Sequence, residues 1–200
     1  MESIILASGS PRRQEFFRLL GLPFTCIPAA IDETPPEGLG PGQAAGNIAL
    51  RKVTAVAEKL ARNEPVPPGS RFIFGADTIV VLEGGIFGKP SDRGAAGQML
   101  GRLAGRRHEV ITAMALYNMK EKTTDCRSVS CEVEFAPLTD AEIAWYLDTG
   151  EWEGAAGAYR LQEAGGCLIR SVHGSPSAVA GLPLHDFYVM LRDNGYRIGA

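Results

Sequence analysis

The segment from Phe72 to Leu82 constrains the fold most strongly, because nearly every position in it is apolar. Such a run is typical of a strand that is covered on both faces. Asp77 interrupts it, and a carboxylate there costs several kcal/mol unless it is paired, hydrogen-bonded or bound to a cation. Gly75 and Ala76 leave room for a ligand or another backbone segment to approach. The segment therefore predicts a buried strand with a functional aspartate, although a structural network could also hold it.

An unusual charge pattern lies near the N-terminus, where residues 8–13 read Ser-Gly-Ser-Pro-Arg-Arg. Ser10 is a suitable N-cap and Pro11 a suitable first residue for a helix. Arg12 and Arg13 then fall in the first turn, where a helix already carries partial positive charge. A phosphate bound by backbone N–H groups and guanidinium groups would explain this arrangement. A pair of solvated arginines is the alternative.

Two lysines are candidate partners for the same anionic ligand. The helix predicted over 43–62 has an apolar sector formed by Ala45, Ala49, Val53, Val56 and Leu60. Lys52 projects within that sector, so its ammonium either extends to water, which the local pattern favours, or points into a site. Lys89 stands between Gly88 and Pro90 after a predicted hairpin, where it is well placed to meet a phosphate although no P-loop pattern is present.

The other segments alternate between strands and helices. Strands are predicted at 110–117, at 127–135 from polar and apolar alternation, and at 167–172. Thr139 and Glu142 form a capping box, and the last helix starts at Leu184 with Phe187, Tyr188 and Leu191 on its apolar face. We expect an α/β fold and one domain over residues 1–200, since no repeat or linker interrupts the chain.

Composition excludes several classes of protein. The chain has 45% hydrophobic and 22% charged residues and no apolar run long enough to span a bilayer or act as a signal peptide. Its four cysteines form no C-x-x-C pair, which argues against zinc and disulfides and suits a reducing cytoplasm. A formal net charge of −3 argues against a nucleic-acid polymer and favours a small anionic ligand. The three histidines, His108, His173 and His185, lie in no catalytic motif and are expected to fill surface or core positions.

These residues together suggest a polyphosphate site. Arg12, Arg13, Lys52 and Lys89 around Asp77 would support attack of water on a phosphoryl group. Asp32 and Glu33 are either solvated loop charges or oxygen ligands of a hard divalent cation.

Six short motifs occur in the order and spacing of one family, and the chain resembles that family over essentially its whole length. They are Ala7–Arg13, Asp32-Glu33, Gly75–Thr78, Gly88–Pro90, Ala156–Tyr159 with Gln162, and Gly174-Ser175 with Gly181–Leu184. The family is Maf, whose members are cytoplasmic house-cleaning nucleoside triphosphate pyrophosphatases. The resemblance implies an elongated mixed β-sheet flanked by helices, in two lobes with a central cleft, as in inosine triphosphate pyrophosphatases. It also implies a homodimer.

The resemblance further implies roles for individual residues. The enzyme would cleave between the α- and β-phosphates with Mg²⁺ or Mn²⁺, with Asp77 as catalytic residue and Glu33 and Asp77 at the metal. The implied substrate-binding residues are Ser8, Arg12, Arg13, Lys52, Thr78, Lys89 and Gln162. The motifs are closest to the branch that acts on dTTP and UTP.

Three positions depart from the family pattern and bear on nucleobase preference. Ala155 stands where a lysine is common, and Arg160 and Glu163 stand where glycines are common. We hypothesise that Arg160 takes over the role of the missing lysine. A non-catalytic nucleotide-binding regulator of septum formation and a nucleotidyl transferase are the alternative functions, although a pure sensor has little need of a buried carboxylate.

Overall fold

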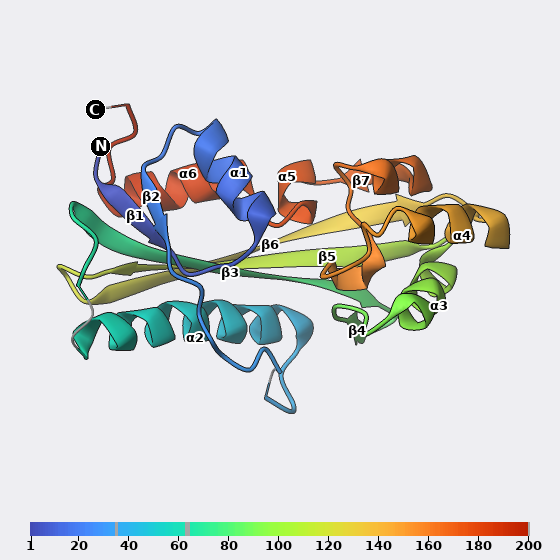
Figure 1. Cartoon of the computed structure of the whole chain (residues 1–200), viewed down its shortest axis with the longest axis horizontal. Coiled ribbons are helices and arrows are strands. Elements are labelled where there is room, and N and C mark those ends of the chain that lie inside the picture. Colours follow the sequence, from blue (N-terminus) through green and yellow to red (C-terminus); the bar gives the residue numbers. More distant parts are fainter. Residues whose placement is uncertain (35, 63–64, 200) are drawn as a thin grey trace. The chain divides into compact units, whose positions relative to one another are not determined.

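The computed structural model describes residues 1–34, 36–62 and 65–199. Within them, seven strands form one sheet in the order β2-β1-β3-β5-β6-β7, with β4 paired to β3 (Figure 1). The strands are β1 (Ser3–Leu6), β2 (Phe24–Cys26), β3 (Ser70–Leu82), β4 (Gly85–Phe87), β5 (Arg107–Asn118), β6 (Thr123–Phe135) and β7 (Ile169–His173). The sheet is mixed, because β1 is parallel to β2 and β3 whereas β4 and β7 are antiparallel to their neighbours.

Helices flank this sheet, so the predicted α/β fold is confirmed. They are α1 (Pro11–Leu19), α2 (Pro41–Ala61), α3 (Arg93–Leu103), α4 (Asp140–Asp148), α5 (Pro176–Val179) and α6 (Leu184–Asp193), with 3-10 turns η1 (Ala156–Ala158) and η2 (Ala164–Leu168). The chain divides into two compact units. The first comprises Met1–Asp77, Thr112–Val129 and Gly181–Ala200, and the second comprises Thr78–Ile111 and Ser130–Ala180.

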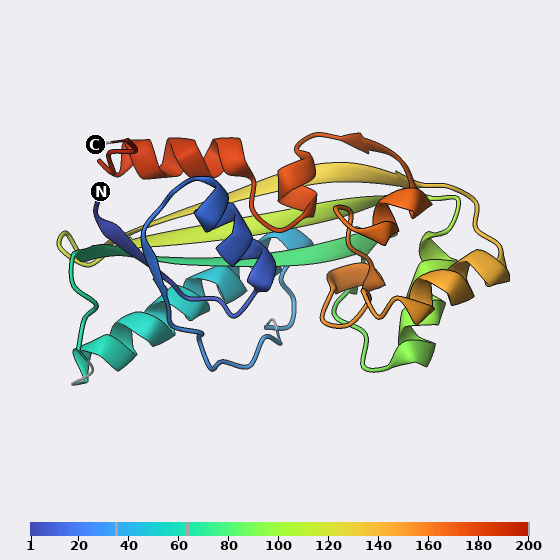
Figure 2. The ribbon, with the colours of Figure 1, turned by 45° about the horizontal axis from the view of Figure 1, so that its top comes forward.

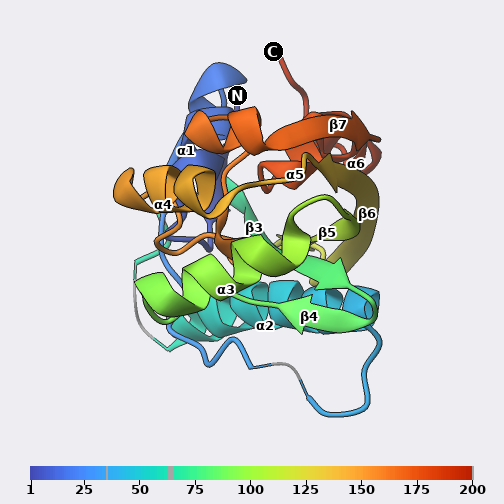
Figure 3. The ribbon, with the colours of Figure 1, turned by 90° about the vertical axis from the view of Figure 1, so that its right-hand side faces the viewer.

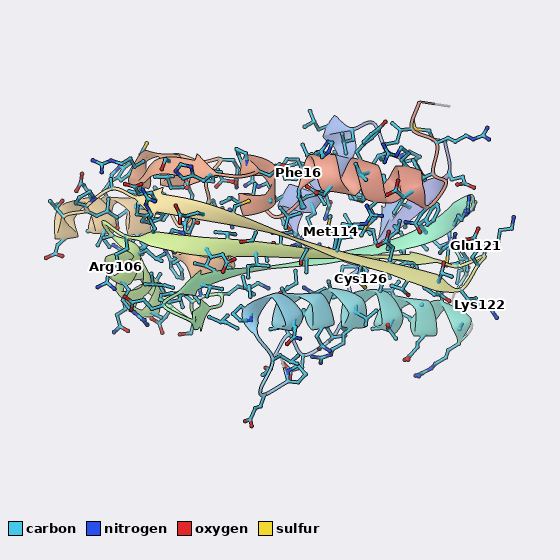
Figure 4. All side chains as sticks on the ribbon, turned by 180° about the vertical axis from the view of Figure 1, so that it is seen from behind. Phe16, Arg106, Met114, Glu121, Lys122 and Cys126 are labelled. Carbon is cyan, nitrogen blue, oxygen red and sulfur yellow. The ribbon has the colours of Figure 1, made fainter. Side chains whose placement is uncertain are left out.

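In the first unit, α1 and α6 cover one face of the strands and α2 covers the other (Figures 1 and 2). Phe74 of β3 packs between Phe17 of α1 and Phe187 of α6, with ring centroids 5.7 and 4.5 Å away. Met114 belongs to the same core and lies between the sheet and α6 (Figure 4). On the opposite face, α2 buries the predicted apolar sector. Alternate residues of β3 therefore face α1 and α6 on one side and α2 on the other.

In the second unit, α3 packs against α4 and η1 (Figure 3). Leu100 and Leu103 of α3 and Tyr146 of α4 are fully buried in its core. The alternation predicted for 127–135 is confirmed at Cys131, which is buried between the exposed residues Ser130 and Glu132, and at the buried residues Val133 and Phe135. Thr139 and Glu142 form the predicted capping box at the start of α4.

Several element boundaries differ from the predictions. Strand β5 begins at Arg107, before the apolar run, because its first residues alternate between solvent and core. Cys167 lies in η2, since the strand begins only at Ile169. Tyr188 is exposed, so its assignment to the apolar face of α6 was wrong: that face is narrower than the spacing indicated. No helix among the described residues is long and apolar enough to span a membrane.

Candidate active site

A glycine in β3 lets helix α2 approach the strand that carries Asp77. A Cβ atom on Gly75 would lie 3.0 Å from Val53 Cγ1 and 3.1 Å from the Ala49 carbonyl oxygen, so a larger residue would push the helix away. Side chains alternate along a strand, and Asp77 therefore faces the same side as Gly75. The expected close approach at Gly75 is thus made by the backbone of α2.

Lys52 of α2 ends against two carboxylates. Its Nζ lies 2.8 Å from Asp77 Oδ1 and 2.9 Å from Glu33 Oε1, and it donates a longer bond of 3.4 Å to the Ala76 carbonyl. The Lys52 side chain is only 6% exposed and that of Asp77 11% exposed. The expectation that Lys52 extends to water was wrong. Its ammonium is buried instead, and it is stable there because the two carboxylates and the carbonyl accept its hydrogen bonds.

The carboxylates of Glu33 and Asp77 fit a hard divalent cation. They already converge on one positive charge, and both supply the oxygen ligands that Mg²⁺ and Mn²⁺ prefer. The described residues contain no cluster of three or more His, Cys, Asp or Glu side chains that could hold a metal by itself. A cation held here would complete its coordination with water and phosphate oxygens, as Mg²⁺ commonly does.

The N-terminal turn is organised around Arg13. Its Nε donates to the Gly181 carbonyl at 2.9 Å, and its Nη1 donates to Ser8 Oγ at 3.2 Å. Burial lowers the pKa of Arg13, and the charges of Asp77 and Glu33 oppose that effect. Ser10 occupies the predicted N-cap position of α1, but its side chain makes no cap bond; its N–H donates to Ser8 Oγ instead.

Arg12 differs from Arg13, because its Nη1 pairs with Glu15 Oε2 on the same helix at 3.3 Å. The first turn of α1 contains no acidic residue. Anion binding by this positive end of α1 and the guanidinium groups beside it stays a prediction.

Three other predicted substrate-binding residues, Thr78, Lys89 and Gln162, belong to the second unit. The Gly88 carbonyl, next to Lys89, accepts a hydrogen bond of 3.0 Å from the N–H of Gly157. The segments that carry Lys89 and Gln162 are thereby joined. The predicted site residues thus divide between the two units: Ser8, Arg12, Arg13, Glu33, Lys52 and Asp77 belong to the first, and Thr78, Lys89 and Gln162 belong to the second.

Charged side chains of the loop around Gln162 bond to the backbone and to each other. Arg160 donates from Nη2 to the Glu153 carbonyl at 2.7 Å and pairs with Glu163 at 3.4 Å. Glu151 accepts hydrogen bonds from the N–H groups of Ala164 and Gly165. Two of the positions that depart from the family pattern therefore pair with each other.

A model of the family described as Maf-like protein matches residues 3–194. The chain belongs to the Maf family. The dTTP/UTP pyrophosphatase of Symbiobacterium thermophilum is 42% identical over 99% of this chain and 97% of its own length. That of Escherichia coli O157:H7 is 42% identical over 96% of this chain and 92% of its own length. Among solved structures, the Ham1 protein of Staphylococcus aureus matches with a TM-score of 0.46 and 16% identity over 68% of this chain and 72% of that one.

Two contacts of this Maf protein were missed by sequence reasoning. The Gly181 carbonyl bonds Arg13 from far along the chain, and a backbone acceptor has no sequence signature. His108 is buried and bonds the hydroxyl of Tyr159, the last residue of the Ala-Gly-Ala-Tyr motif. The one sequence signal for the His108 contact was its position next to a predicted buried strand. A histidine in such a position is more often a packed core residue than a functional one.

Proposed function

We propose that this Maf protein is a nucleoside triphosphate pyrophosphatase that hydrolyses the bond between the α- and β-phosphates, preferably of dTTP and UTP. One observation carries the proposal: an ammonium group holds two carboxylates together beside a buried strand, in the same unit as the arginine-bearing start of α1. The relatives named dTTP/UTP pyrophosphatase support the choice of substrate.

In the proposed reaction, Asp77 accepts a proton from the water that attacks phosphorus. A new P–O bond forms to this water, the bridging P–O bond breaks, and its electron pair leaves with pyrophosphate. Lys52 orients the Asp77 carboxylate through its short contact of 2.8 Å.

The remaining residues have binding roles in this proposal. Arg12, Arg13 and Ser8 at the start of α1 hold the phosphate chain, and Lys89, Thr78 and Gln162 contact the nucleotide. Glu33 and Asp77 would hold Mg²⁺ or Mn²⁺, which when bound neutralises phosphate charge. We also propose that residues 1–200 work as one domain, since β3, β5 and β6 contribute residues to both units; Ala200 lies outside the described residues.

Two further proposals follow from family membership. We propose that the protein is a homodimer, which light scattering of the purified chain would test. We propose also that it acts in the cytoplasm, where its nucleotide substrates are found, and fractionation of cells tests this.

Product analysis tests the proposed function. The protein is incubated with each NTP and dNTP and Mg²⁺ in ¹⁸O-labelled water. Free monophosphate and pyrophosphate, with one ¹⁸O in a product, are the expected result. Nucleotide binding without turnover would favour the regulator of septum formation. A nucleotidyl group transferred to another acceptor, with no label from water, would indicate the transferase.

A further inference from the structure

The buried side chain of His108 is not used by the proposed reaction. It lies near the start of β5, it is 3% exposed, and its Nε2 is 2.8 Å from the hydroxyl oxygen of Tyr159. Its ring meets those of Phe135 and Tyr159 edge to face, with centroids 5.1 and 5.5 Å away. A histidine that served only to fill this aromatic core could be a phenylalanine.

The polar atoms of His108 are costly in that core. Its Nδ1 is buried and makes no hydrogen bond to any described residue, and a buried polar atom without a partner destabilises the folded state. Burial also lowers the pKa of His108 from 6.5 to about 4, so the ring is neutral at physiological pH. An imidazole kept at this cost therefore calls for a reason beyond packing.

The bond to Tyr159 reaches the segments that carry the substrate-binding residues of the second unit. Tyr159 directly follows Gly157 and Ala158, whose φ values of 68° and 64° are left-handed. The Gly157 N–H donates to the Gly88 carbonyl, and Lys89 is the next residue. Gln162 follows three residues after Tyr159. A short chain of contacts thus runs from His108 to both segments.

We propose that His108 is a positioning residue that fixes Tyr159 and, through it, the segments bearing Lys89 and Gln162. The inference rests on the proposed function for its effect on turnover, but not for its effect on the loop. The bond holds the hydroxyl oxygen in place and so fixes the depth and direction of the Tyr159 side chain, which in turn restrains the backbone on either side of Tyr159.

Four variants separate positioning from packing: His108→Phe, Tyr159→Phe, the double variant, and His108→Gln as a conservative control. Glutamine places an amide nitrogen near the position of the imidazole Nε2 and so retains the bond to Tyr159. The first measurement is hydrogen exchange of the Gly157 amide. We expect about tenfold faster exchange in His108→Phe and Tyr159→Phe, and exchange within about twofold of wild type in His108→Gln.

The second measurement is steady-state kinetics with UTP and thermal unfolding. Both single variants should raise KM about tenfold with kcat nearly unchanged, because Asp77 and Lys52 are untouched. The double variant leaves no unpaired hydroxyl in the core, so its Tm should recover toward wild type while KM stays raised. His108→Gln should rescue KM.

Two results would overturn the inference. The first is an unchanged rate of hydrogen exchange at the Gly157 amide in His108→Phe. The second is a double variant in which both KM and Tm return to their wild-type values. Absence of turnover in the wild-type protein would instead contradict the proposed function. The exchange experiment needs no substrate and would still decide the role of His108.

Discussion

At the scale of single residues, the cost of a buried charge explains the centre of the candidate site. Asp77 sits in an otherwise apolar strand, where the ammonium of Lys52, shared with Glu33, and the charge of Arg13 offset its loss of hydration. The same contacts that make Asp77 tolerable also orient its carboxylate for the proposed chemistry.

Replacing Asp77 by asparagine should abolish most turnover and preserve the fold. Asparagine keeps an oxygen for Lys52 but cannot take a proton from water, so kcat should fall about 10²–10⁴-fold. Asp148→Asn is a matched control, because Asp148 is 71% exposed and pairs with Arg93 on the surface. Circular dichroism and kinetics check both variants. A near-normal kcat in Asp77→Asn would rule out its catalytic role.

His108 should make the protein less stable in acid. The pKa of His108 is about 4 in the folded chain and about 6.5 when unfolded, so the unfolded chain binds the extra proton between these values. Stability is therefore lost as pH falls from 6.5 to 4, by about 3 kcal/mol from this group. Urea unfolding at several pH values should show a smaller loss in His108→Gln. His173→Gln, at an exposed site, should behave like wild type.

At the scale of elements, left-handed glycines fix the loop between α4 and η2. Gly157 combines a φ of 68° with a tight contact, since a Cβ there would lie 2.8 Å from Val80 Cγ2. Gly154 has nearly the same φ, 69°, but no atom within 4 Å of such a Cβ. Comparing substitutions at Gly157 and Gly154 therefore distinguishes the cost of the left-handed backbone from the cost of a steric clash.

Gly157→Ala should destabilise the protein by about 3 kcal/mol and Gly154→Ala by about 1 kcal/mol. In both variants the alanine must adopt a left-handed backbone conformation, which is unfavourable for a residue with a Cβ atom. Only the alanine at position 157 must also displace Val80. Denaturant unfolding gives the two free energies. Equal losses would show that the contact with Val80 relaxes at no cost.

Replacing Arg160 tests the hypothesis that its guanidinium binds the triphosphate in place of the lysine that is missing at position 155. Arg160→Ala should raise KM several-fold, far more than Ala155→Lys changes it. The pair with Glu163 sharpens the test. If the guanidinium binds phosphate, Glu163→Ala should leave KM unchanged or lower it. If the ion pair only shapes the loop, Glu163→Ala and Arg160→Ala should raise KM alike, and the hypothesis fails.

At the scale of the whole molecule, an acidic protein is proposed to bind an acidic ligand. The formal net charge is −3, so attraction for a triphosphate comes from local groups such as those at the start of α1. Arg12 is the better probe of this attraction. Removing Arg13 would also take away the hydrogen bonds that its guanidinium donates to the Gly181 carbonyl and to Ser8 Oγ.

Raising the salt concentration from 50 to 500 mM should raise KM for UTP roughly three- to tenfold. Arg12→Ala should raise KM at low salt and flatten its salt dependence. Arg62→Ala is the control, since Arg62 is 80% exposed and pairs with Glu58 on the last turn of α2. An unaltered salt dependence in Arg12→Ala would restore the interpretation of a solvated arginine.

Patterns between near neighbours made much of this protein predictable. The buried strand with Asp77, the apolar sector of α2 and the capping box at Thr139 follow from spacings of two to four residues. Such patterns fix which element forms and which face it buries. The order of the short motifs along the chain also indicates the Maf family.

Only the tertiary structure decided which groups meet. Local pattern favoured solvent for Lys52, but packing of α2 over Gly75 brought its Nζ to Asp77. Arg13 bonds Gly181, 168 residues away, and His108 bonds Tyr159, 51 residues away. Sequence by itself determined the elements and the charges they carry, since these depend on neighbours along the chain. Partners within hydrogen-bonding distance depend on how elements distant in sequence pack, and no local pattern specifies that.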